Sequence, residues 1–433
     1  PLFIEELTKT LLEQPAEQTP APQTPNIPVT LLDSLAARLD RLGPAKETAQ
    51  WAAVLGREFS YPILQACVPY AEGRLQGDLA RLLEAELVSA VAPAQNVASK
   101  GAAPTLYQFK HALIQEAAYA SLLKRTRQTR HQHVAETLIT HFPQIGETQP
   151  EMLAQHYSNA GLPAAAIDCW LQAGEQATVH GATLEAQTFF DRALAIIEPT
   201  DREQRWRALA GREVVFNLRA ERNAQQRDID ALLELAETFN DDTRRAQARL
   251  RQMHYALLRQ NYQLAQSAAD AARACAQQAD APVLEVDALA GKTSAFTSVG
   301  KLDAAQQTVA EMLARLPRTD DEGIRAYALS CLAIYHHFVG DLSHAVLLWQ
   351  QAGQAVQRVG NRVREARTAL NVGFTFLQLG LYTQAGTTLE GVDAALDNQA
   401  AFARLARKVI SDLGYGDQLG DDPDQDQADD QGD

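Results

Sequence analysis

Apolar residues recur at helical spacing almost without interruption between residues 146 and 413, which predicts a series of amphipathic helices. Within this stretch four short segments match one another at a spacing of 40 residues, and they end at Ala265, Ala305, Ala345 and Ala385. Their sequences are QNYQLA, GKLDAA, GDLSHA and GLYTQA, so that three of them place a glycine in the same column. A fixed period of this length is typical of a solenoid built from helical hairpins.

The repeated residues suit the turn of such a hairpin. Glycine ends the first helix in a left-handed conformation, and alanine lets the second helix lie close to its neighbour. Because a single hairpin leaves one apolar face uncovered, the stacking of successive hairpins supplies the core. The pattern predicts a mostly α fold, and we expect the first helix of each hairpin to line an extended concave surface.

A related pattern lies upstream, in the spacing of the tetratricopeptide repeat. It is carried by Trp170, Ala173, Gly174, Ala177, Ala186, Phe190, Ala193 and Pro199, with the proline one residue late. An overlapping register fits too, so the register stays open at this stage. Between residues 200 and 245 we predict helices but place no repeat boundary. Because the 40-residue period exceeds the usual 34, we expect each downstream helix to be about a turn longer.

The first third of the chain has a different pattern. Helical spacing covers residues 31–42, 45–55 and 75–87, and the segments LVSAVA and TLYQF then alternate as two strands of a hairpin. Further helices are predicted over residues 111–124 and 130–141. Helices followed by a hairpin are the outline of a winged helix, which we assign to residues 29–145, ahead of a tetratricopeptide-like α-helical solenoid at 146–413.

Three further segments complete the predicted organisation. Residues 1–13 have the apolar spacing of the end of a helix, and residues 14–28 hold five prolines and no basic residue, which is typical of an extended linker. Residues 414–433 have lost the apolar pattern and are predicted to be a disordered acidic tail. The chain begins with Pro1 and not with Met, so we expect it to be a piece of a longer protein.

The net charge becomes informative only when charged residues are counted segment by segment. The sequence has 39 Lys and Arg against 54 Asp and Glu, a formal net charge of −15. Eight of the aspartates lie in residues 417–433, and without them the balance is 39 basic against 46 acidic residues. Residues 28–145 are close to neutral, with twelve basic and ten acidic residues. A helix that reads DNA should be net basic, so we expect no nucleic-acid partner for the winged helix.

The positions of the cysteines and the hydropathy of the chain argue against disulfides, zinc sites and membrane segments. Cys67, Cys169, Cys275 and Cys331 are far apart and form no Cys-x-x-Cys pair, which argues against a disulfide framework or a zinc site. No signal peptide and no run of 18 apolar residues is found, so we expect no membrane partner and a cytoplasmic protein.

Several of these segments together resemble a known family. PLFIEEL at residues 1–7, followed by IPVTLLDSLAARLDRL at 27–42, resembles the end of the lid in signal-transduction ATPases of the AAA-like STAND type. YQFKHALIQEAAYASLL at 107–123 resembles the end of their winged-helix domain, and LAQHYSNAG at 153–161 resembles the entry to their repeat array. The resemblance covers most of residues 1–200; beyond residue 200 only the repeat architecture matches.

The resemblance implies a non-catalytic chain within a larger signalling protein. The nucleotide site of this family lies upstream of Pro1, so ATP and Mg²⁺ are expected only for that missing module and no cofactor for this chain. It implies a winged helix that contacts the upstream ATPase module. Many bacterial relatives carry a class III adenylate or guanylate cyclase domain or a protein kinase domain, and others a DNA-binding domain. Two alternatives therefore stay open: the tuning region of a cyclase or kinase, and the sensor half of an ATP-dependent transcription regulator.

One short segment imitates a phosphate loop. Gly291-Lys292-Thr293 has the ending of that motif, but Val286 stands where the loop needs its first glycine. The preceding LEVDALA reads as a helix of the repeat array and not as a strand. We therefore predict that this segment binds no phosphate.

The other candidate chemistry is equally sparse, and we predict no catalytic residue and no metal ligand. His131 and His133 belong to the basic segment KRTRQTRHQH, residues 124–133, which we interpret as a solvated face or a contact to the upstream module. His336, His337 and His344 gather near Gly340, where His337 and His344 fit helix faces and need no ligand role. The tryptophans at 51, 170, 206 and 349 are expected in the core.

The solenoid is the predicted functional surface. We expect it to bind a protein or peptide on its concave face, and a bound partner could then shift how the winged helix and the ATPase pack together. The candidate contacts, taken from the first helices of two hairpins, are Tyr335, His337, Arg367 and Asn371.

Overall fold

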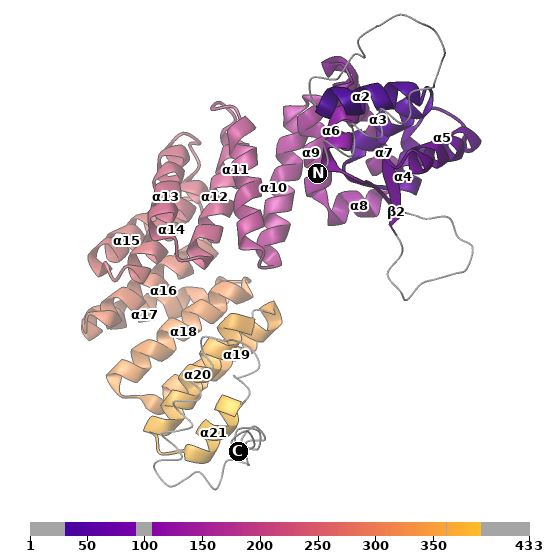
Figure 1. Ribbon diagram of the computed structural model, residues 1–433. Coiled ribbons are helices and arrows are strands. Elements are labelled where there is room, and N and C mark those ends of the chain that lie inside the picture. The colour runs from indigo at the N-terminus through magenta and orange to yellow at the C-terminus, as the bar shows by residue number, and fades with distance from the viewer. Residues whose placement is uncertain (1–30, 92–105, 361, 391–433) are drawn as a thin grey trace, which may run out of the picture. The chain divides into compact units, whose positions relative to one another are not determined.

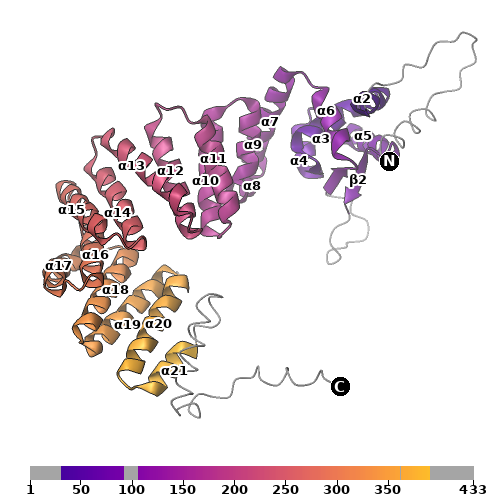
Figure 2. The same cartoon turned by 60° about the vertical axis from the view of Figure 1, so that its left-hand side comes forward.

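The computed structural model describes residues 31–91, 106–360 and 362–390. It divides into two compact units, residues 1–221 (unit 1) and 222–433 (unit 2). Both units consist mainly of helices (Figures 1 and 2). The predicted lid-helix end at 1–13, the linker at 14–28, the acidic tail at 414–433 and the last part of the predicted solenoid lie outside the described residues. In the described part of the chain, no helix is both long enough and apolar enough to cross a membrane.

The first part of unit 1 is a helical domain with a small sheet, and its assignment as a winged-helix-like domain stays a prediction. Its helices and strands are α2 (Leu31–Arg41), α3 (Ala45–Leu55), β1 (Glu58–Ser60), α4 (Tyr61–Cys67), α5 (Glu72–Glu84), β2 (Val88–Val91), β3 (Leu106–Phe109), α6 (Ala112–Ala120) and α7 (Lys124–His141). The antiparallel sheet has the strand order β1-β3-β2. Phe59 pairs with Tyr107, and Val88 pairs with Phe109.

Two elements of this domain were not predicted, and three others have bounds that differ from the predicted ones. Strand β1 has three residues, too few for an alternating pattern to be recognised, and α4 follows it directly. The helix predicted at 75–87 spans 72–84 and ends before Glu86, whose φ of 54° lies in the left-handed region. The helix predicted over 111–124 ends at Ala120, and α7 begins at Lys124, so the basic segment 124–133 is helical throughout.

The core of this domain joins the helices to the sheet. Leu64, Leu82 and Phe109 are fully buried, and the cluster continues through α7 to Leu153. Several polar side chains are buried in it, and among them the Thr48 hydroxyl donates a hydrogen bond of 2.8 Å to Asp78. Burying a polar group is costly unless it is paired, and this bond satisfies the Asp78 carboxylate.

Helical hairpins make up the rest of unit 1. The helices are α8 (Pro143–Thr148), α9 (Pro150–Ala160), α10 (Pro163–Val179), α11 (Thr183–Ile196) and α12 (Arg202–Leu218). The Phe190 ring of α11 lies between two helix glycines. A β-carbon on Gly174 of α10 would come within 2.8 Å of that ring, and one on Gly211 of α12 within 2.4 Å. Glycine is required at both positions because any side chain would overlap the ring.

Unit 2 consists of helical hairpins with the predicted period. Its helices are α13 (Arg222–Glu237), α14 (Asp242–Leu258), α15 (Tyr262–Gln278), α16 (Pro282–Ser298), α17 (Leu302–Arg315), the short 3-10 helix η1 (Leu316–Arg318), α18 (Glu322–Val339), α19 (Leu342–Val359), α20 (Arg362–Gln378) and α21 (Tyr382–Glu390). The four alanines that mark the repeat are fully buried. The first helices of successive hairpins contact one another, α14 with α16 and α16 with α18, so that these helices form one layer.

The turns of unit 2 follow a finer rule than the 40-residue period. Gly300, Gly340, Gly360 and Gly380 all have positive φ, and so do Asn240, Gln260 and Asp280. Left-handed residues therefore recur every 20 residues over most of the unit, once after almost every helix. Each 40-residue repeat therefore contains two segments of 20 residues, and glycine occupies the left-handed position in only some of these segments.

Candidate functional site

The candidate site is a groove in unit 2 between α18 and α20. Each helix contributes one stripe of residues at a spacing of three or four, which brings them onto one face. On α18 the stripe is Tyr327, Ser330, Cys331, Ile334, His337 and Phe338; on α20 it is Arg364, Arg367, Thr368, Asn371, Phe374, Thr375 and Gln378. Helix α19 packs against both and places the Trp349 side chain, 5% exposed, in the groove.

Two neighbouring cavities make up this α18–α20 groove. One has a volume of about 290 Å³ and extends to Ser294 on α16; the other has about 300 Å³ and contains the exposed ring of Phe338. Both are lined by Ile334, Trp349 and Asn371. The shared residues make the two cavities one continuous site.

The charged side chains among the described lining residues are arginines, although Asp287 of α16 acts electrostatically on Tyr327 and Cys331. Arg364 and Arg367 line the groove, and His337 adds an imidazole, whereas none of the lining residues that the structure describes is Asp or Glu. Four aromatic rings, those of Tyr327, Phe338, Trp349 and Phe374, line the same groove. The groove thus combines an apolar floor with positively charged walls.

The thiol and the phenol among the described groove residues are not activated. Burial raises the pKa of the Cys331 thiol to about 12, so this sulfur stays protonated and unreactive at neutral pH. Burial also holds the pKa of the Tyr327 hydroxyl well above its ordinary value. These two groups can pack and donate hydrogen bonds, but they do not act as bases or nucleophiles.

Three of the four predicted contacts lie in this groove. His337 lines the larger cavity, Arg367 lines the smaller one, and Asn371 lines both. Tyr335 does not belong with them: it is 8% exposed and packs in the core cluster with Val309 and Leu332. Because Tyr335 lies about 100° around α18 from Ile334, it points toward the core and leaves almost no surface for a partner.

The sequence analysis missed most of the groove residues. Tyr327, Ile334 and Phe338 could have been found, since they share the three-to-four spacing of His337 on one helix. Arg364 could also have been found, because it lies at helical spacing from Arg367 and Asn371 on α20. Trp349 could not have been found in this way, because it comes from the second helix of the hairpin and reaches the groove only through packing.

The segment that imitates a phosphate loop is helical, as predicted. Gly291, Lys292 and Thr293 lie inside α16, where Lys292 forms an ion pair of 2.6 Å with Asp270. A β-carbon on Gly291 would lie 2.3 Å from the sulfur of Met253. The glycine serves close packing between α14 and α16 and not the wrapping of a phosphate.

The basic segment 124–133 is exposed at Lys124, Arg125 and His133, in line with a solvated face, but other side chains of it pack inward. His131 is 3% exposed and points inward. The guanidinium of Arg130 stacks over the Trp51 ring at 4.4 Å, and that of Arg127 over the Tyr119 ring at 4.9 Å. Several of its cationic side chains are therefore used to attach α7 to its own domain. The four tryptophans are each at most 8% exposed, as predicted.

A second cavity, of about 650 Å³, lies in unit 1 and is lined by residues from α3 to α11. His131 and His156 lie in its wall with their Nδ1 atoms 2.9 Å apart, and the Tyr119 hydroxyl lies 3.0 Å from Nε2 of His131. Burial lowers the pKa of each imidazole to about 4, and the charge of His131 contributes for His156. The pair is neutral at physiological pH.

Comparison with known proteins identifies the fold but no family. The family model described as cobalamin biosynthesis protein CobT matches residues 376–433, a short part of the chain of which 391–433 lie outside the described residues. An uncharacterized protein of Rhizobium meliloti (strain 1021) is 29% identical over 198 residues, which cover 45% of this chain and 18% of that protein. The chain thus matches less than a fifth of this relative's length.

Among solved structures, the chain is similar to a signal transduction ATPase with numerous domains (STAND) from Pyrococcus horikoshii that has a tetratricopeptide repeat sensor. The TM-score is 0.53 at 12% identity, over 95% of this chain and 57% of that chain. A Rap protein complexed with competence and sporulation factor gives a TM-score of 0.49 at 10% identity, over 69% of this chain and 82% of that chain. At such identities the likeness concerns the fold: a tetratricopeptide-like helical solenoid.

Proposed function

We propose that this chain is the regulatory, non-catalytic portion of a cytoplasmic STAND-type signalling ATPase, and that the α18–α20 groove binds a protein or peptide partner. The observation that carries the proposal is the composition of the groove: aromatic rings beside two arginines, with no carboxylate among its described lining residues. Aromatic and arginine side chains are the groups that contribute most to protein recognition. The family resemblance of residues 1–161 and the fold likeness to a STAND protein support the parent's class.

The groove chemistry selects a partner segment that carries both acidic and large apolar side chains. Arg367 can hold a carboxylate through two parallel hydrogen bonds, while the floor at Trp349 takes an apolar side chain. The amide of Asn371 both donates and accepts, which suits it to a peptide backbone. Each cavity is close to the size of one or two side chains, so a short extended or helical segment fits better than a flat protein surface.

Binding in the groove would act on the ATPase by changing how the helices of the solenoid pack against one another. A partner that favours one arrangement of the solenoid shifts the equilibrium by its difference in affinity between the arrangements. The winged-helix-like domain, which we propose contacts the upstream ATPase module, is the part that would transmit this shift. The acting ligand is thus a protein or peptide, and the nucleotide belongs to the upstream module.

The groove can be tested by selecting peptides from a random displayed library on the full chain and measuring their affinity by fluorescence anisotropy. We expect selected peptides to be rich in Asp or Glu beside large apolar residues. Loss of a charge-assisted hydrogen bond is worth about 1.5–3 kcal/mol, so Arg367→Ala should weaken binding by about ten- to a hundredfold.

Two control variants make this result specific. Arg227→Ala removes an exposed arginine of α13, outside the groove but in the same unit, and should leave the affinity unchanged. Tyr335→Phe changes a predicted contact that the structure places in the core, and it should also bind normally. Equal affinity of Arg367→Ala and the unmodified chain for every selected peptide would rule out the groove as the site.

A further inference from the structure

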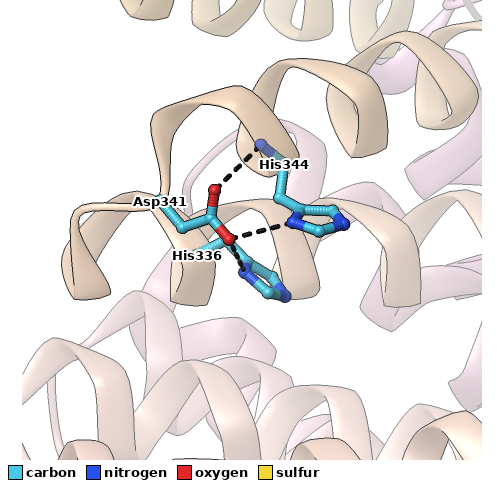
Figure 3. A group of neighbouring side chains, drawn as sticks. All are labelled: His336, Asp341 and His344. Carbon is cyan, nitrogen blue, oxygen red and sulfur yellow. Dashed lines mark hydrogen bonds and ion pairs between the residues drawn. The ribbon is translucent and has the colours of Figure 1, made fainter.

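The turn between α18 and α19 brings together three side chains with metal-ligating atoms. His336 lies in the last turn of α18, Asp341 is the residue that caps α19, and His344 lies in the first turn of α19. Gly340, with a φ of 92°, reverses the chain between them. Figure 3 shows the two imidazoles on the same side of the turn, with the Asp341 carboxylate adjoining both.

The distances between these atoms are close to those of a coordination shell. Nδ1 of His344 lies 2.9 Å from Oδ2 of Asp341, and Nδ1 of His336 lies 3.4 Å from the same oxygen. One ligand atom from each residue lies within 4.8 Å of the other two. Ligands bound tetrahedrally at about 2.0–2.2 Å from a zinc ion are about 3.3–3.6 Å apart from one another. Small side-chain rotations would bring all three onto one ion.

We propose that His336, Asp341 and His344 form a binding site for a divalent transition-metal ion of the zinc class. Two imidazoles and one carboxylate are a ligand set that such ions accept. Three protein ligands leave the fourth tetrahedral position for water or for a group of a partner. The sequence analysis predicted no metal ligand here, and this proposal replaces that prediction.

The electrostatics of the turn favour a cation. Oδ1 of Asp341 accepts a hydrogen bond of 3.2 Å from the backbone N–H of His344, which leaves Oδ2 to face the imidazoles. This bond and the contact of 2.9 Å between Oδ2 and Nδ1 of His344 hold the Asp341 carboxylate beside both rings. The C-terminal end of α18 adds a negative dipole, and the carboxylate offsets the positive end of α19.

The site is accessible and its ligands come from both helices of one hairpin. The side chains of His336, Asp341 and His344 are 26%, 42% and 65% exposed, so an ion can enter without any rearrangement of the core. A bound ion would link α18 to α19 across their turn. Since it binds the folded state and not the unfolded one, it should stabilise unit 2.

The test is a calorimetric titration of the untagged full chain with Zn²⁺, together with Co²⁺ as a probe whose visible absorption reports its coordination. We expect one saturable equivalent and a rise in the unfolding temperature on adding Zn²⁺. His336→Ala, His344→Ala and Asp341→Asn should each weaken binding by at least about tenfold, since loss of even an outer-shell partner costs that much.

The variants are chosen to separate loss of a ligand from loss of structure. Asparagine at 341 still caps α19, so Asp341→Asn should unfold like the unmodified chain without metal. His337→Ala removes the neighbouring histidine, which lines the groove, and should retain full metal affinity. The proposal is overturned if no saturable binding occurs, or if the three ligand variants bind Zn²⁺ as tightly as the unmodified chain.

Discussion

Gln260 holds a backbone conformation that glycine holds at the matching turn one repeat later. Its φ is 56°, and that of Gly300 is 72°. Both residues donate their backbone N–H to the carbonyl three residues earlier, at 3.0 Å in each turn. The two turns therefore have the same geometry, and only one of them has the residue that adopts it without a steric cost.

This difference predicts a stabilising substitution. A residue with a β-carbon pays about 1–2 kcal/mol in the left-handed region, whereas glycine gains about 0.4–1 kcal/mol of entropy in the unfolded chain. Gln260→Gly should thus raise the free energy of unfolding by about 0.5–1 kcal/mol, measured by urea unfolding of the full chain. The matched change Gly300→Ala should lower it by about 1 kcal/mol. A loss of stability in Gln260→Gly would contradict the argument.

At the scale of elements, the contact between α7 and α9 depends on a buried histidine pair. His131 and His156 are 3% and 5% exposed, and their ring centroids are 5.1 Å apart. Each imidazole has a folded-state pKa of about 4, against an ordinary value near 6.5. Folding therefore requires both rings to be neutral.

The sign of the pH dependence follows from these values. Below pH 6.5 the unfolded chain binds protons on these histidines that the folded chain does not bind. The stability of unit 1 should be highest above pH 6.5 and should fall as the pH is lowered from 6.5 toward 4. Thermal unfolding at a series of pH values measures this fall.

Two variants isolate the contribution of the pair from that of the other titrating groups. The double variant His131→Asn/His156→Asn should lose much of the decline between pH 6.5 and 4. His180→Asn, which changes an exposed histidine of the same unit, should retain it. An identical pH profile in the double variant and the unmodified chain would show that the pair does not titrate in this way.

At the scale of the whole molecule, two compact units carry different features. Unit 1 holds the helical domain with the small sheet and the histidine pair, and unit 2 holds the α18–α20 groove and the turn with His336, Asp341 and His344. The net negative charge of the chain does not indicate the local charge of the groove. Eight aspartates of residues 417–433 account for about half of the net −15, while the groove itself is lined by cationic and aromatic groups.

The whole chain is expected to hydrolyse no ATP. The only segment that imitates a phosphate loop in the described part of the chain is packed inside α16, with Lys292 paired to Asp270. A helix directs its amides along its own axis and cannot wrap a phosphate. Release of inorganic phosphate from ATP by the purified chain should not exceed the buffer blank. Turnover that Lys292→Ala abolishes would contradict this prediction.

Much of the fold could be predicted because its causes are local. The glycine and alanine columns of the 40-residue repeat encode a turn and a close helix contact, and the structure has both at those positions. The missed elements were short: β1 exists because its three residues pair with β3, from which they are separated by about 50 positions in the chain. No local pattern marks such a strand.

By itself, the sequence determined the helical repeat and which residues share a face of one helix, such as Arg367 and Asn371 on α20, whose role as partner contacts stays a prediction. Only the tertiary structure decided which face of α18 meets the core, and so buried Tyr335. It also decided that His336, Asp341 and His344 converge across a turn. The physical reason is the same in both cases: spacing fixes direction around one helix axis, but what lies in that direction depends on the packing of the neighbouring helix.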